Sequence, residues 1–161
     1  SLKTRGEGMK FLIFMFFCLP NILWACPNIS GDFLCEDNGA STLVRMRQNE
    51  KNGSTYYYDV EFPEQGILAD NKVILVPDQG PRRNSTYRAY CEKTAFKGTL
   101  RGDLYYGKDY MGSFVETTRM ALTVQLDLEI SESTELYMPE EPVEKTFDSK
   151  TCKRQNPVIK I

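Results

Sequence analysis

The sequence predicts an all-β protein, an antiparallel up-and-down barrel of about eight to ten strands held together by disulfides. Three observations carry this prediction. Apolar and polar residues alternate with a period of two along most of the chain after Cys26, turn residues recur about every 8 to 12 positions, and no stretch combines helical spacing with capping residues. Sequential hairpins favour a meander that closes on itself, because closure leaves no exposed strand edge.

The start of the chain has the pattern of a secretory signal peptide. Met9 and Lys10 precede an apolar run over 11–19, and Leu23-Trp24-Ala25 places a small residue at the cleavage position. The run is shorter than the roughly 20 apolar residues that cross a bilayer, so we expect no membrane span. We therefore expect a signal peptide over 9–25.

Residues 1–8 precede that start methionine and read like a purine-rich ribosome-binding leader translated as protein. The remainder, 26–161, suits a single β-barrel domain. We expect this domain to be secreted or periplasmic. As an alternative, Leu23-Trp24-Ala25-Cys26 resembles a bacterial lipobox, and a lipid on Cys26 would tether the protein to a membrane.

Four cysteines follow the signal, and an even number is typical of disulfide pairing in an exported protein. They are Cys26, Cys35, Cys91 and Cys152. If the first and last strands of a barrel meet, the geometry favours Cys26–Cys152 and leaves Cys35–Cys91. A loop before Gly31 would make Cys26–Cys35 an alternative, because an extended chain alone holds those two apart.

Alternation defines the strands of the first half. Asn38-Gly39 and residues 49–53 are turns, and Asp70-Asn71 is expected to form a tight hairpin. The expected strands are 31–36, 41–48, 55–62, 67–69 and 72–76. In 55–62, Tyr56 and Tyr58 share one face, which we expect to point inward, while Tyr57 lies on the other.

The second half continues the pattern. Its clearest strand is predicted over 119–131, where an apolar row from Met120 to Ile130 opposes a mostly polar row. Residues 105–112 are predicted to form an aromatic, glycine-bearing loop. The other expected strands are 85–92, 96–104, 134–138 and 143–152.

Tyrosines are the candidate binding residues. Three of them, Tyr56, Tyr58 and Tyr87, are expected to line a pocket in the barrel, where each would supply an apolar ring and a hydroxyl group that orients a ligand. The alternative is that these three side chains simply pack the core of a filled barrel. Tyr105, Tyr106 and Tyr110 would contact a partner from their loop, or fold over one barrel end.

Composition argues against several functions. The chain has no histidine, the commonest general base and transition-metal ligand. Removing Lys3, Arg5, Lys10 and Glu7 with the signal leaves 17 basic and 21 acidic residues, a net charge of −4, which gives no electrostatic case for nucleic acid. The late acidic residues lack EF-hand spacing, so we expect no metal and no cofactor.

We also expect no enzymatic activity. The carboxylates of Glu61 and Asp103 would be an example of a hydrolytic pair, but nothing in the sequence brings any such pair together.

Two resemblances support a barrel. The pattern Cys26-Pro27-x-x-x-Gly31-x-Phe33-x-Cys35 resembles the opening of small secreted bacterial proteins of unassigned function, and Tyr87-x-Ala89-x-Cys91 has a similar look. Gly31-Asp32-Phe33 resembles the first-strand G-x-W of lipocalin-like β-barrels, and residues 31–41 are similar to the avidin opening with altered spacing. The resemblance implies a barrel, with ligand binding as its function.

These observations predict an exported, non-catalytic protein that holds a small apolar or aromatic ligand in its barrel. The alternative is a secreted or periplasmic interaction or inhibitor module that acts through exposed aromatic loops such as 105–112. The expected partner is accordingly an unidentified small ligand or protein.

Overall fold

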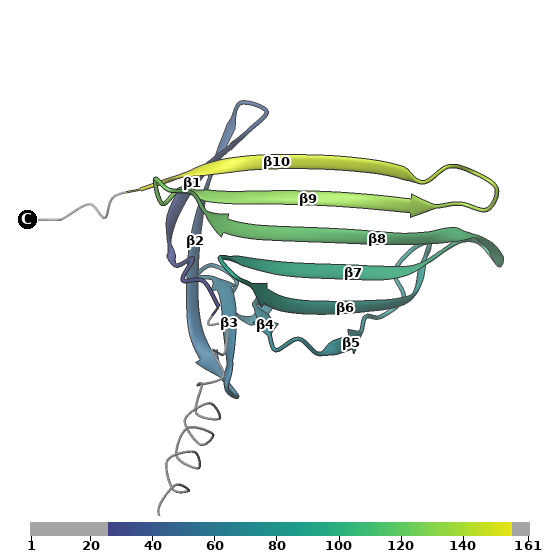
Figure 1. Ribbon diagram of the computed structural model, residues 1–161, viewed down its shortest axis with the longest axis horizontal. Coiled ribbons are helices and arrows are strands. Elements are labelled where there is room, and N and C mark those ends of the chain that lie inside the picture. Colours follow the sequence, from purple (N-terminus) through teal and green to yellow (C-terminus); the bar gives the residue numbers. More distant parts are fainter. Residues whose placement is uncertain (1–25, 156–161) are drawn as a thin grey trace, which may run out of the picture.

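The computed structural model describes residues 26–155, so the predicted leader and signal peptide lie outside the described residues. These residues form one antiparallel sheet of ten strands, which confirms the predicted all-β class (Figure 1). A single 3-10 turn, η2, covers Pro63–Gln65, and the described residues include no helix long and apolar enough to cross a membrane. The strands are β1 Gly31–Asp37, β2 Ala40–Lys51, β3 Ser54–Asp59, β4 Ile67–Ala69, β5 Val73–Leu75, β6 Arg82–Glu92, β7 Ala95–Tyr106, β8 Asp109–Leu122, β9 Leu128–Tyr137 and β10 Glu144–Arg154.

The strand order is β4-β3-β2-β1-β10-β9-β8-β7-β6-β5. Within each half of this order, strands consecutive in sequence pair as hairpins, which is the predicted up-and-down meander. The first and last strands also pair, with Phe33 opposite Arg154, so the two ends of the meander meet as expected. The predicted barrel closure is not complete, however, because the two edge strands of the sheet, β4 and β5, do not pair.

This open seam corrects the prediction of a hairpin about Asp70-Asn71. β4 pairs with β3 and β5 pairs with β6, but the two do not pair with each other. The connecting residues turn toward β6, because the Asn71 amide donates to the Ala89 carbonyl oxygen at 2.8 Å. The Lys72 amide donates to the Asp70 side chain at 3.0 Å, an Asx turn that takes the chain away from a simple hairpin.

The core lies at one end of the long strands. β6 to β10 run side by side, and β1 to β3 cross them steeply at that end (Figure 1). Their buried side chains meet there in one cluster, which includes Phe33, Tyr57, Phe96 and Leu128. The long strands continue beyond this crossing (Figure 1).

In the part of the long strands away from the core, an ion pair lies against a buried aromatic ring. The guanidinium group of Arg82 lies 4.7 Å from the centre of the Phe114 ring, which is only 2% exposed. Arg82 also donates to both carboxylate oxygens of Glu116, one of them at 3.1 Å. This two-bond pairing fixes the guanidinium group over the aromatic ring.

Two disulfides are present, Cys35–Cys152 between the neighbouring strands β1 and β10, and Cys26–Cys91 between the segment before β1 and β6. All four cysteines are therefore paired, but the predicted connectivity is wrong. The register that sets Phe33 opposite Arg154 brings Cys35 and Cys152 face to face, with Cα atoms 4.2 Å apart. The segment before β1 is not part of that strand, and it carries Cys26 to the end of β6.

The predicted strand over 119–131 is also wrong, because a turn over 123–127 divides it into β8 and β9. The Asp127 amide donates to Thr123 Oγ1 at 3.2 Å. The Asp127 carboxylate accepts hydrogen bonds from Lys153 Nζ at 2.7 Å and from the Arg154 amide at 2.9 Å. The alternation is uninterrupted in the sequence because the turn itself contains apolar residues, Val124 and Leu126, which are exposed.

Candidate functional site

A cavity of about 430 Å³ lies at the open seam. Residues from both edges of the sheet surround it, so the cavity exists because β4 and β5 do not pair. Most of its lining is apolar. The lining residues are Tyr56, Gly66, Ile67, Leu68, Asp70, Lys72, Ile74, Tyr87 and Ala89.

Tyr87 forms one wall of this seam cavity. Its ring lies against Gly98 of β7, where a methyl group would stand 2.4 Å from the Tyr87 hydroxyl oxygen. Only glycine leaves room for the ring there. Burial raises the pKa of the Tyr87 hydroxyl, so the side chain stays neutral and offers an apolar surface with one hydroxyl group.

Tyr56 approaches the cavity from the other edge of the sheet. Its hydroxyl donates to the Pro63 carbonyl oxygen at 2.7 Å, and Lys51 Nζ lies 4.8 Å from its ring centre. These contacts hold the ring beside η2. The cavity wall therefore combines an anchored ring on β3 with a half-buried ring on β6.

The structure corrects the predicted facing of β3. Tyr57 points into the core, with 1% exposure and its ring 5.2 Å from that of Phe96, while Tyr56 and Tyr58 stack on the opposite face. The alternation of Tyr56 and Tyr58 continues in the sequence to Val60 and Phe62, but β3 ends at Asp59 and both of these apolar residues are exposed.

Of the three tyrosines predicted to line a pocket, Tyr56 and Tyr87 line the seam cavity and Tyr58 does not. The sequence interpretation missed the aliphatic lining from β4 and β5. The signal was present in the short apolar segments around Asp70, but only the strand order shows that their separation leaves a cavity.

The other three tyrosines lie at the β7–β8 hairpin. A tight turn at Gly107, with φ of +63°, replaces the predicted loop. The rings of Tyr105 and Tyr110 meet edge to face with centres 5.6 Å apart. Tyr106 is 81% exposed, so its ring faces solvent and does not cover an end of the sheet.

The described residues offer no metal-binding cluster. No three cysteine, aspartate or glutamate side chains among them converge on a point that could hold a metal ion. Glu61 lies 4.0 Å from the guanidinium group of Arg45, and Asp103 accepts from Asn84 Nδ2 at 2.8 Å. Each of these two carboxylates thus has its own surface partner.

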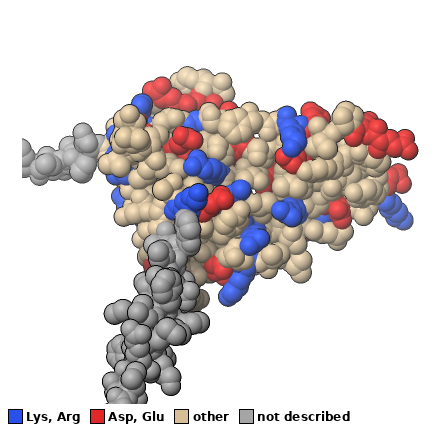
Figure 2. All heavy atoms as spheres, viewed as in Figure 1, with Lys and Arg blue, Asp and Glu red and all other residues tan. Residues whose placement is uncertain are grey.

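The surface has mixed charge. The face drawn in Figure 2 shows basic side chains over its middle, with acidic ones interspersed and more frequent toward the tip of the long strands. Comparisons with protein-family models, with curated proteins and with solved structures found no match for the chain.

Proposed function

We propose that this protein is an exported binding protein without catalytic activity, and that it holds a small apolar or aromatic ligand in the seam cavity. The cavity carries the proposal. Its volume of about 430 Å³ falls within the roughly 300–1,000 Å³ of small-molecule sites. Apolar groups supply most of the lining, and the side chains of Asp70 and Lys72 are the charged groups at the cavity that could orient a ligand.

The disulfides support the location. Disulfides form and persist in oxidising compartments outside the cytosol, and this protein has two. Together with the predicted signal peptide over 9–25, they support secretion or residence in the periplasm. The sulfur of Cys26 is bonded to that of Cys91, which favours an untethered protein over a lipid-anchored one.

Titration with N-phenyl-1-naphthylamine, a neutral aromatic probe that fluoresces in apolar sites, tests the cavity. Ile74→Trp fills it from the edge strand, and Val73→Trp puts the same ring on the opposite face of that strand. We expect saturable binding that weakens at least about tenfold in Ile74→Trp and stays unchanged in Val73→Trp. Equal affinities in the two variants would contradict the proposal.

A second candidate function rests on the β7–β8 tip. Tyr106, Tyr110 and Met111 are exposed there, and aromatic residues and methionine are enriched in protein interfaces. The protein would then act as an interaction or inhibitor module. Pull-down from secreted or periplasmic extracts of the source cells tests it: a bound protein should be lost with Tyr106→Ser/Tyr110→Ser and kept with Tyr58→Ser.

A further inference from the structure

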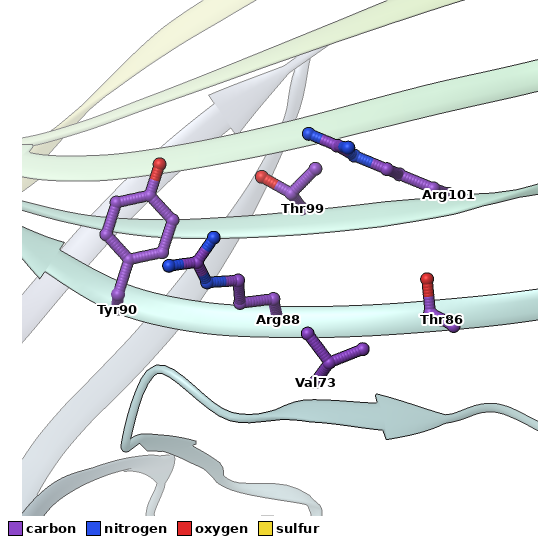
Figure 3. Close-up of a pocket in the computed structure, with 6 residues that line it drawn as sticks. All are labelled: Val73, Thr86, Arg88, Tyr90, Thr99 and Arg101. Atoms are coloured by element: carbon purple, nitrogen blue, oxygen red, sulfur yellow. The ribbon is translucent and has the colours of Figure 1, made fainter.

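A separate polar pocket of about 140 Å³ lies on the outer face of the sheet. Strand β5 divides it from the seam cavity, because Val73 lines the polar pocket and its neighbour Ile74 lines the cavity. The lining residues, drawn in Figure 3, are Val73, Thr86, Arg88, Tyr90, Thr99 and Arg101.

Strand register brings two arginines together in this pocket. Thr86 pairs with Arg101 and Arg88 pairs with Thr99 across β6 and β7, so the two arginines occupy one diagonal and the two threonines the other. Figure 3 shows the Arg101 side chain running toward Thr99, while the guanidinium group of Arg88 lies between Tyr90 and Thr99. Nitrogen donors of two cations and a hydroxyl donor thus converge on one small space.

These two arginines lack carboxylate partners. Among the described residues, neither Arg88 nor Arg101 has a carboxylate oxygen within 4.0 Å, whereas Arg119 on the same face pairs with Glu129 at 3.5 Å. Arg88 Nε donates to the Asn71 side chain at 2.7 Å, which orients the group and leaves its terminal nitrogens free to bind a ligand. The pocket therefore holds two guanidinium groups that have no direct ion-pair partner among the described residues.

The wall beside Arg88 is aromatic. The guanidinium carbon of Arg88 lies 5.2 Å from the centre of the Tyr90 ring, and Lys97 Nζ lies 5.9 Å from it. Lys97 adds positive charge at the rim, although it lies 3.9 Å from Glu92. The Tyr90 ring thus forms the aromatic wall of the pocket, with Arg88 and Lys97 packed against it.

We propose that this pocket binds a phosphate or sulfate group. Guanidinium groups match the oxygen geometry of such groups, and hydroxyl and guanidinium donors can satisfy several oxygens together. The small volume fits a single tetrahedral oxyanion, and the Tyr90 ring would contact the organic part of the ligand outside the pocket. This inference does not depend on the proposed function of the seam cavity.

Nuclear magnetic resonance titration of the intact protein tests the site. Inorganic phosphate and sulfate, compared with chloride at equal ionic strength, should produce saturable amide shifts centred on Thr86, Arg88, Thr99 and Arg101. Arg88→Gln and Arg101→Gln should each weaken binding about tenfold, the typical effect of losing a charged hydrogen bond. Arg45→Gln removes an exposed arginine that has an acidic partner and should leave binding unchanged.

Thermal unfolding of each variant verifies that it folds. Glucose 6-phosphate and glucosamine 6-sulfate then distinguish a phosphorylated from a sulfated ligand. Weaker binding of either compound to the double variant Arg88→Gln/Arg101→Gln supports the site. The proposal is overturned if chloride gives the same shifts, or if the double variant binds as the unaltered protein does.

Discussion

Tyr57 illustrates how a single side chain connects segments that are distant in the sequence. Its ring packs on Phe96, and its hydroxyl donates to the Pro27 carbonyl oxygen at 2.7 Å and lies 3.7 Å from Cys91 Sγ. One residue of β3 thereby holds the segment that leads into β1 against the end of β6. Burial also raises the pKa of this hydroxyl, so it remains a donor at ordinary pH.

We expect Tyr57→Phe to destabilise the protein by about 1 kcal/mol, because it leaves the Pro27 carbonyl oxygen without its partner. Tyr58→Phe is the matched control: its ring lies on the opposite face of β3, and its loss of a hydroxyl should cost little. Urea unfolding measures both. Equal stabilities of the two variants would contradict the assigned role of the Tyr57 hydroxyl.

Asp127 predicts a pH dependence. Hydrogen bonds from Lys153 and from the Arg154 amide hold the pKa of its carboxyl below the ordinary value of 3.8. The stabilisation is therefore present above that value and is lost as the pH falls through the lowered pKa. Asp127→Asn should unfold at a lower temperature than the unaltered protein at pH 7, and this difference should shrink on acidification toward pH 2.

Asp148→Asn serves as the control for that experiment, because Asp148 is an exposed aspartate on β10. A difference between Asp127→Asn and the unaltered protein that does not change with pH would show that the carboxylate charge is not what stabilises the turn.

At the scale of elements, the turn over 123–127 shows what alternation can and cannot predict. Period-two patterns located most strands to within a few residues, because half-buried strands impose that period. They failed at this turn, since Val124 and Leu126 preserve the pattern while facing solvent. Thr123 supplies a local hydrogen bond, but the contacts to the Asp127 carboxylate come from Lys153 and Arg154, distant residues that no local pattern reveals.

The same turn contains a residue that is unfavourable for its backbone. Leu126 has a φ of +66°, a conformation that asparagine tolerates better than leucine, and its side chain is 53% exposed. We expect Leu126→Asn to stabilise the protein by about 0.5 kcal/mol. Val124→Asn, at a fully solvated neighbouring position, should have no comparable effect, and chemical denaturation distinguishes the two.

At the scale of the whole molecule, pairing between distant residues determined what the sequence could not predict. Most strands, β8 and β9 excepted, follow from local patterns. The open seam, the disulfide connectivity and the Arg88–Arg101 pocket all depend on strand register. Tyr56 and Tyr87 were singled out as aromatic residues on expected strands, but their place at a seam required the full strand order.

The disulfides close loops of 65 and 117 residues, Cys26–Cys91 and Cys35–Cys152 respectively. Chain-entropy arguments assign roughly 4–5 kcal/mol to loops of this length. Removing either disulfide should therefore lower the free energy of unfolding by several kcal/mol. The two double variants that do so are Cys35→Ala/Cys152→Ala and Cys26→Ala/Cys91→Ala. Peptide mapping without reduction tests the connectivity, and recovery of a Cys26–Cys152 peptide would contradict it.

The pairing of β1 with β10 also has a kinetic consequence. It is the one ladder among the described strands that joins the two ends of the chain, while every other ladder forms between neighbours in sequence. Long-range contacts of this kind slow folding, because the intervening chain must first be ordered. The Cys35–Cys152 bond crosses that ladder. Once oxidised, the chain no longer has to search for its most distant pairing, and each later unfolding and refolding starts with the ends already joined.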